Sequence, residues 1–231
     1  MRILIIKFLF LFSVLYSFNA TASDARHKWY MNFVSKVPQK EERSIQTLVA
    51  YLSRPMQNDY DKAQAFAYWI ASHIIYDKFL YSAGEVTKLG KKYNKQSISS
   101  ILQTRVGLCV DYATLFEEMC KQAGIKAGHI DGYAVDLNGN LSRTNILKNN
   151  AHRWNYFIYN NRTVYVDPTW MASGQLVAKR MITEYNHKMA IKKNTLKNRN
   201  SCEIYNVKPY YFDFTYKAEY RDMDVKRTEK N

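Results

Sequence analysis

Three side chains spread along the chain could together carry out acyl transfer. Cys109 is a nucleophile, His152 could take up and return its proton, and Asp167 could hold the imidazole in one tautomer. Each residue taken alone is more often structural: a buried cysteine, a histidine with satisfied hydrogen bonds, and an aspartate that caps a turn before Pro168. Because a structural explanation must account for all three at once, we predict a catalytic triad.

Cys109 stands at the predicted start of a helix that runs to Gly124, a residue typical of C-terminal helix stops. A thiol in the first turn lies at the positive end of the helix macrodipole, which favours the thiolate. The N–H of this residue has no partner within the helix and can meet a developing oxyanion. We expect Gly107 to let a substrate backbone approach closely. The apolar residues that repeat at helical spacing after Cys109, and so predict this helix, are Tyr112, Leu115, Phe116, Met119 and Ala123.

Residues 151–159 and 163–167 have the composition and alternation of two β-strands. Between them, Asn160-Asn161 tolerates the positive φ angles of a two-residue hairpin turn. Such a turn places Phe157 and Val164 on the side of the sheet that would enter a core. The sequence therefore predicts an antiparallel hairpin.

The same turn sets the register of the candidate catalytic residues. It places Trp154 opposite Asp167 and His152 opposite Thr169, with all four side chains on one face. His152 and Asp167 are then diagonal neighbours, about 7–8 Å apart between backbones, and the carboxylate can accept a hydrogen bond from the imidazole.

Helices are predicted ahead of the cysteine. The first runs from Lys40 to Arg54 and is ended by Pro55. The second begins after a cap at Asn58-Asp59 and stops near Tyr76-Asp77. A short third helix covers Ile98 to Gln103. Strands are predicted afterwards, over Ile125 to Leu137, in the hairpin, and in an aromatic run from Tyr210 to Tyr216. Helices followed by strands indicate the α+β class.

Six short motifs stand in order along the chain. They are KAQAFAYWIASHIIYD (Lys62 to Asp77), GLCVDYATLF (Gly107 to Phe116), Gly124-Ile125, GYA (Gly132 to Ala134), AHRWN (Ala151 to Asn155) and VDPTW (Val166 to Trp170). As an ordered set they resemble the transglutaminase-like superfamily of papain-fold cysteine enzymes, and most of all its kyphoscoliosis-peptidase-like branch. The resemblance implies a papain-like α+β core in which the cysteine helix packs on an antiparallel sheet. It also implies Cys109 as nucleophile, His152 as general base and acid, and Asp167 as orienting group.

Three further residues are candidates for supporting roles. Tyr76 corresponds by motif to an aromatic residue near the cysteine in relatives, and the alternative is core packing. Gln103 precedes Cys109 by six residues, a spacing that resembles the oxyanion glutamine of papain-like proteases, and the alternative is an exposed helix residue. Of these two candidates for a second oxyanion donor, Tyr76 is preferred. Trp154 is expected to shield the histidine–aspartate pair.

The predicted organisation has five parts. Residues 1–22 form a signal peptide, 23–39 an N-terminal extension, and 40–175 the transglutaminase-like core. Residues 176–221 are a C-terminal extension of the same domain, and 222–231 are a charged tail. Where relatives often continue the last motif with glycine, this chain has Met171-Ala172-Ser173-Gly174, which leaves the shape of that loop open.

The leader prediction depends on the first residues. Arg2 precedes an apolar run from Ile3 to Phe18 that carries Lys7, and Ala20-Thr21-Ala22 provides small residues for a signal peptidase. The alternative, a membrane anchor, requires roughly 20 predominantly apolar residues. We therefore predict cleavage near Ala22 and export, to the periplasm or outside the cell. No later stretch is apolar enough to span a bilayer.

The chain has a formal net charge of +14, which favours acidic partners such as an anionic envelope polymer. The lysines are scattered, so a uniformly solvated basic surface is the preferred interpretation, and no nucleic-acid signature is present. The three cysteines leave at least one thiol unpaired, with a Cys120–Cys202 disulfide left open. No cofactor is expected, because CxxC, HExxH and EF-hand patterns are missing from the sequence.

The predicted function is acyl transfer on amide bonds of a protein or peptide substrate. Hydrolysis, by a protease or deamidase, is favoured over crosslinking, because aminolysis needs a site that excludes water. A transglutaminase that crosslinks protein glutamines is one alternative. Another is a non-catalytic binding module on the same fold. The oligomeric state is left open.

Overall fold

The computed structural model describes residues 24–76, 96–134, 151–172, 207–213 and 220–221, and residues 1–22 of the predicted leader lie outside them. Residues 24–34 are helical. The helices that follow are η1 (Glu41–Arg43), α2 (Ile45–Ser53), α3 (Asp59–His73), α5 (Ile98–Thr104), α6 (Cys109–Gln122), α8 (Pro168–Ala172) and η3 (Pro209–Tyr211). In the described part of the chain, every helix is too short or too polar to cross a membrane.

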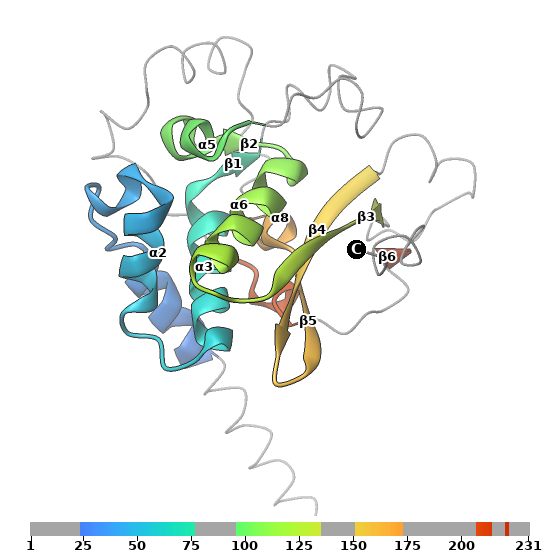
Figure 1. Cartoon of the computed structure of the whole chain (residues 1–231), viewed down its shortest axis with the longest axis horizontal. Helices are drawn as coiled ribbons and strands as arrows, with labels where there is room; N and C mark the ends of the chain where they lie inside the picture. Colours follow the sequence, from blue (N-terminus) through green and yellow to red (C-terminus); the bar gives the residue numbers. More distant parts are fainter. Residues whose placement is uncertain (1–23, 77–95, 135–150, 173–206, 214–219, 222–231) are drawn as a thin grey trace, which may run out of the picture.

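The strands form two sheets. A four-stranded antiparallel sheet has the order β5 (Arg162–Val166), β4 (Ala151–Tyr159), β3 (Ala127–Ala134) and β6 (Tyr220–Arg221). The short strands β1 (Ile75–Tyr76) and β2 (Val106–Gly107) pair in parallel. Helices α3 and α6 lie between α2 and the four-stranded sheet (Figure 1). The fold is therefore α+β, with the cysteine helix packed on an antiparallel sheet, as predicted.

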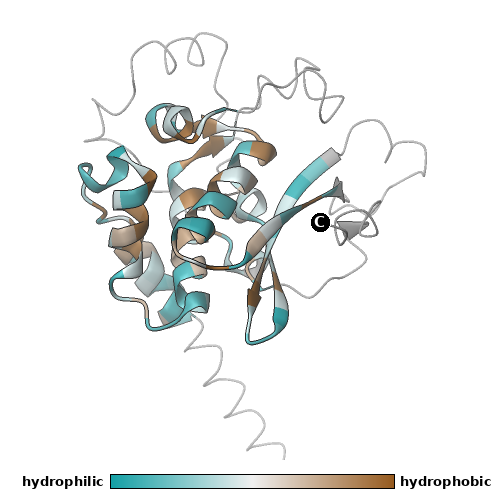
Figure 2. Ribbon diagram, in the orientation of Figure 1, coloured by the Kyte–Doolittle hydropathy of each residue, from teal (hydrophilic) through white to brown (hydrophobic). Residues whose placement is uncertain are grey.

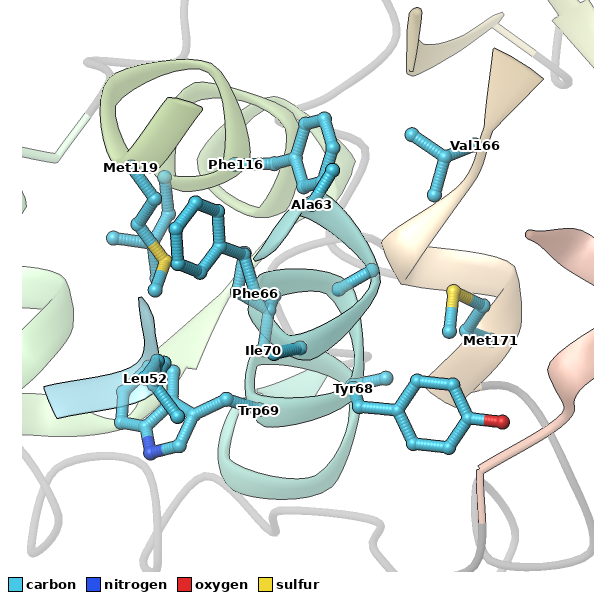
Figure 3. Packing of buried hydrophobic residues seen from close by; sticks show 14 of the residues in the cluster. Leu52, Ala63, Phe66, Tyr68, Trp69, Ile70, Phe116, Met119, Val166 and Met171 are labelled. Carbon is cyan, nitrogen blue, oxygen red and sulfur yellow. The ribbon is translucent and has the colours of Figure 1, made fainter. Parts of the chain in front are cut away.

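Helix α3 forms the centre of the core, with every residue from Ala63 to Ser72 buried. Figure 3 shows its side chains leaving in different directions, with Phe66 beside Met119 of α6 and Tyr68 on the opposite side. Figure 2 shows the hydrophobic residues of α2, α3 and α6 gathered toward the centre of the molecule. Consecutive residues point to every side of a helix, so this stretch of α3 is enclosed on all sides.

The hairpin register matches the prediction. Asn160 and Asn161 have φ angles of 49° and 59°, and Tyr156 pairs with Tyr165. Phe157 and Val164 are fully buried, as expected for the core side. The prediction was wrong about how far the pairing extends, because the ladder ends at Asn155 and Val166.

Beyond this point the chain leaves the sheet. Pro168 begins α8, since proline cannot donate to a ladder but suits the first turn of a helix. Thr169 therefore lies in a helix and is not paired with His152, and Asp167 is not paired with Trp154.

Three other boundaries differ from the predictions. The helix predicted from Lys40 is divided at Ser44, which is extended and caps α2 by accepting from the Thr47 N–H at 3.2 Å. Helix α3 stops at His73, before Tyr76, because the next residues pair with β2. The aromatic run from Tyr210 begins as the 3₁₀ turn η3 behind Pro209, and only the bridge from Phe212 to Val166 is strand-like; residues 214–216 lie outside the described residues.

Candidate active site

The structure brings Cys109, His152 and Asp167 together from three elements. Cys109 opens α6, His152 lies near the start of β4, and Asp167 follows β5. His152 Nε2 is 2.6 Å from Asp167 Oδ2, and the Cys109 thiol is close enough to the same imidazole to raise its pKa. Because Nε2 is occupied by the carboxylate, Nδ1 is the nitrogen left for the thiol. All three side chains are buried.

The charge state of His152 follows from these neighbours. Burial acts to lower its pKa, but the charge and hydrogen bond of Asp167, together with the hydrogen bond and charge of Cys109, outweigh burial and raise the pKa to about 10. The imidazole therefore keeps its proton at neutral pH. A protonated imidazole beside the thiol can stabilise a thiolate and can later give its proton to a leaving group.

Asp167 uses its two carboxylate oxygens for different partners. While Oδ2 contacts His152, Oδ1 accepts a hydrogen bond from the Trp170 N–H at 2.9 Å. The turn-capping role and the orienting role considered for this residue are thus compatible. Since the carboxylate is held on both oxygens, the imidazole it contacts has a defined orientation.

Two tryptophans enclose the histidine. Trp154 is fully buried, and its ring lies 6.0 Å from that of His152 with an angle of 18° between the planes. The ring of Trp170, which is half-buried, lies 5.7 Å away on a tilted plane. Trp154 thus lies where a residue that shields the histidine–aspartate pair from water would have to lie.

A buried carboxylate that the sequence reasoning missed shapes the loop before Cys109. Asp111 accepts from the Leu108 N–H at 2.8 Å and from the Gln96 N–H at 3.2 Å. A Cβ at Gly107 would approach the Asp111 Cβ to 2.8 Å. Gly107 is thus required because this side chain fills the space, and the approach of a substrate backbone at this glycine stays a prediction. An acidic residue at the third helical position was the available signal.

A second missed group lies on the other side of the loop. Arg105 is buried, has a left-handed backbone (φ 59°), and places its guanidinium 4.5 Å from the centre of the Trp69 ring. Its Nη2 lies 3.5 Å from Glu42 Oε2, and Glu42 also accepts from the Trp69 Nε1–H at 3.0 Å. These contacts tie the residue that enters the cysteine loop to α3 and η1. The low hydrophobicity of Glu42 and Arg105 gave no indication that they are buried.

The two candidate oxyanion residues have different positions. Tyr76 is half-buried in β1, paired in register with Gly107, and its ring lies 6.3 Å from that of Tyr112. Gln103 has an exposed side chain on α5. Of these two residues, the structure places Tyr76 beside the cysteine loop.

Two thiols can be compared directly. Cys109 and Cys120 are both free and buried, whereas Cys202 lies outside the described residues. Burial, and to a smaller extent Glu117 and Asp59, raise the pKa of Cys120 well above its ordinary value, so it stays protonated. Within the ranges that the structure describes, no group of three or more His, Cys, Asp or Glu side chains is placed to hold a metal ion.

Comparisons with known proteins agree with this arrangement. The family model of the Transglutaminase-like superfamily matches residues 46–171, more than half of the chain. The chain belongs to this superfamily. Kyphoscoliosis peptidase of Homo sapiens is 30% identical over 138 residues, covering 60% of this chain and 19% of that protein. Kyphoscoliosis peptidase of Mus musculus is 28% identical over 128 residues, covering 54% and 18%. These similarities confirm the predicted branch.

Similarity is limited in extent. The chain spans less than a fifth of the length of the two peptidases. A solved structure described as a TGase shares 16% identity with a TM-score of 0.43, covering 66% of this chain and 39% of the other. Family membership supports a cysteine enzyme and leaves the choice of acyl acceptor open.

Proposed function

We propose that this chain is an exported cysteine enzyme that transfers acyl groups from amide bonds, with Cys109, His152 and Asp167 as its triad and water as the usual acceptor. The observation that carries the proposal is the buried His152, hydrogen-bonded to Asp167 at 2.6 Å and acted on by the neighbouring Cys109 thiol. A histidine with these two partners is arranged to pass a proton between nucleophile and leaving group.

The reaction would proceed in two stages. The Cys109 thiolate attacks the amide carbonyl carbon, and the resulting oxyanion is met by backbone N–H groups of the first turn of α6, with Tyr76 as a second candidate donor. His152 gives its proton to the leaving nitrogen as the C–N bond breaks, which leaves a thioester on Cys109. Water then attacks the thioester carbon while His152 takes one of its protons, and as the C–S bond breaks a carboxylic acid is released and the Cys109 thiolate is regenerated beside the protonated His152.

Hydrolysis is proposed over crosslinking, since water is the acceptor available to any accessible thioester, whereas transfer to an amine requires a site that keeps water away from it. The peptidase names of the two relatives agree with this choice. The substrate class is then a protein or peptide.

We also propose that the chain is exported and that its basic surface binds an acidic partner. Cleavage near Ala22 would release a chain whose net charge stays strongly positive, suited to an anionic envelope polymer. Mass spectrometry of the protein recovered outside the cytoplasm should give an N-terminus at Ser23. An intact Met1 in that fraction would contradict cleavage.

The first experiment is intact-mass analysis after treatment with limiting iodoacetamide at pH 6, where an unperturbed thiol is mostly protonated. We expect one adduct, mapped to Cys109, and slow labelling in the Cys109→Ala and His152→Ala variants. Slow labelling in the wild type, equal at all three cysteines, would exclude the enzyme and favour a binding module. Peptide libraries with and without a labelled amine would then separate hydrolysis from crosslinking.

A further inference from the structure

A short segment beyond the family match packs against the candidate site. Residues 207–213 follow the matched region, which ends at residue 171. Val207, Tyr211 and Phe212 are buried. The Lys208 N–H donates to the Met171 carbonyl at 2.9 Å, so the segment begins against α8. We call residues 207–213 the C-terminal strap.

The strap holds the main chain at Asp167. The β4–β5 ladder ends one residue earlier, at Val166, so the hairpin supplies no partner for the Asp167 N–H. That group donates to the Tyr211 carbonyl at 3.0 Å, and Val166 forms a bridge with Phe212. The candidate catalytic carboxylate therefore sits on a backbone that is fixed by the strap.

The strap also supports the aromatic wall of the site. The Tyr211 ring meets the Trp170 ring edge-on, with centroids 5.3 Å apart and planes at 87°. Trp170 in turn lies 5.7 Å from His152, and its N–H caps Asp167. Tyr211 thus contacts Asp167 through its backbone carbonyl and Trp170 through its ring.

The far end of the strap is fastened to the hairpin. Arg162 makes two hydrogen bonds of 2.7 Å to the Asp213 carboxylate, and the Tyr60 hydroxyl donates to it at 2.9 Å. The Asp213 N–H donates to the Tyr165 carbonyl at 2.9 Å. With contacts at both ends, the strap cannot shift without moving the β5–α8 junction.

We propose that Tyr211, in the C-terminal strap, is a positioning residue, which sets the place of Asp167 and Trp170 against His152. The proposal rests on the proposed function for its catalytic meaning. It departs from the family description in requiring a segment that the family match does not include. Tyr211 itself touches no reacting atom.

The test compares two neighbouring aromatic residues of the strap in the full-length mature chain. Tyr211→Ala removes the ring that faces Trp170, whereas Phe212→Ala removes one that packs into the main core against Tyr60 and Phe157. Tyr211→Phe keeps the ring and should restore wild-type behaviour. Thermal unfolding of each variant measures the stability lost, and both alanine variants should lose a similar amount.

Two readouts report on the site in the folded protein. One is the alkylation rate of Cys109 at pH 6, and the other is NMR titration of the His152 ring. The described groups that act on this ring are Asp167, from the β5–α8 junction, and Cys109, from α6. In Tyr211→Ala we expect alkylation to slow on the order of tenfold, because small displacements of reacting groups are costly, and the His152 titration to move to lower pH. Phe212→Ala should leave both readouts unchanged.

Equal readouts in Tyr211→Ala and the wild type, or equal changes in both alanine variants, would overturn the positioning role. The NMR readout does not need a reactive thiol. If wild-type Cys109 proves inert while the His152 titration still shifts only in Tyr211→Ala, the proposed function fails and the role of the strap stands.

Discussion

Helix α6 carries a free, buried cysteine near each end, and the two have different surroundings. Cys109, in the first turn, is a neighbour of His152 and helps to raise the pKa of that imidazole. Cys120, in the last turn, has a pKa raised well above its ordinary value by burial, with small additions from Glu117 and Asp59. The two residues are thus of the same type, lie on the same helix and are both buried. They differ in the groups that surround the thiol.

The helix itself increases this difference. Its N-terminus, where Cys109 lies, carries partial positive charge, and its C-terminus carries partial negative charge, which disfavours a thiolate at Cys120. Only the N-terminal cysteine also has a protonated base held by a carboxylate. A buried cysteine thus becomes a candidate nucleophile through its position on the helix and the group that faces it.

The largest expected effect comes from His152→Ala. Without the imidazole, amide turnover should fall on the order of 10²- to 10⁴-fold, because general acid–base catalysis is lost. Alkylation of Cys109 at pH 6 should slow to the rate of Cys120. Turnover can be followed with any peptide that the wild-type chain cleaves.

A matched control is His129→Ala. His129 lies on β3, and its Nδ1 is 2.7 Å from a carboxylate oxygen of Glu117, a residue of α6. Its removal should leave turnover and Cys109 labelling within about twofold of wild type, since exposed pairs contribute little. Equal losses in the two histidine variants would mean that the difference between the thiols does not come from His152.

Asp167→Asn should have the next largest effect. The amide keeps the size of the carboxylate but removes the negative charge that raises the pKa of His152, after burial has acted to lower it. Because an adjacent opposite charge shifts a pKa by about 1–3 units, the pKa of His152 should fall by that order, and Cys109 labelling should slow at pH values above the lowered pKa, where the imidazole no longer carries its proton. NMR titration of His152 checks the cause, and an unchanged titration would disprove it.

Much of this site could be predicted because its geometry is local. The Asn160-Asn161 turn fixes the hairpin register as far as Asn155 and Val166, which brings His152 of β4 close to Asp167, the residue that follows β5. Helical spacing from Cys109 to Gly124 likewise fixes the start of α6. In both cases the element was predicted from the periodicity of its side chains together with a turn or stop residue at its end.

The remainder depends on contacts between distant segments. Burial of Glu42 depends on Arg105, 63 positions later, and both residues belong to types that are normally exposed. The strap residue Tyr211 meets Asp167 only because the chain returns to α8. Neither contact follows a periodic pattern in the sequence, so neither could be predicted from periodicity. The break at Ser44 was missed for a smaller reason, a cap inside an otherwise helical pattern.

A third prediction concerns the pH dependence of stability. The pKa of His152 is raised from its ordinary 6.5 to about 10 in the fold, so its contribution to stability is fully present below about pH 6.5 and is lost as the pH rises toward 10. The free energy of unfolding of the wild type minus that of His152→Gln should therefore be largest near pH 6. Urea denaturation at several pH values measures it. A difference that grows with pH would contradict the raised pKa.

The smallest effect on the site is expected from Cys120→Ala. Cys120 contacts the core and has no part in the proposed chemistry, so turnover and Cys109 labelling should match the wild type. The free energy of unfolding should fall by about 1–2 kcal/mol, because a small cavity is left. Cys120→Ser should cost more, since its hydroxyl needs a hydrogen-bond partner in the core. A loss of turnover in Cys120→Ala without loss of stability would show that both ends of α6 act in the site.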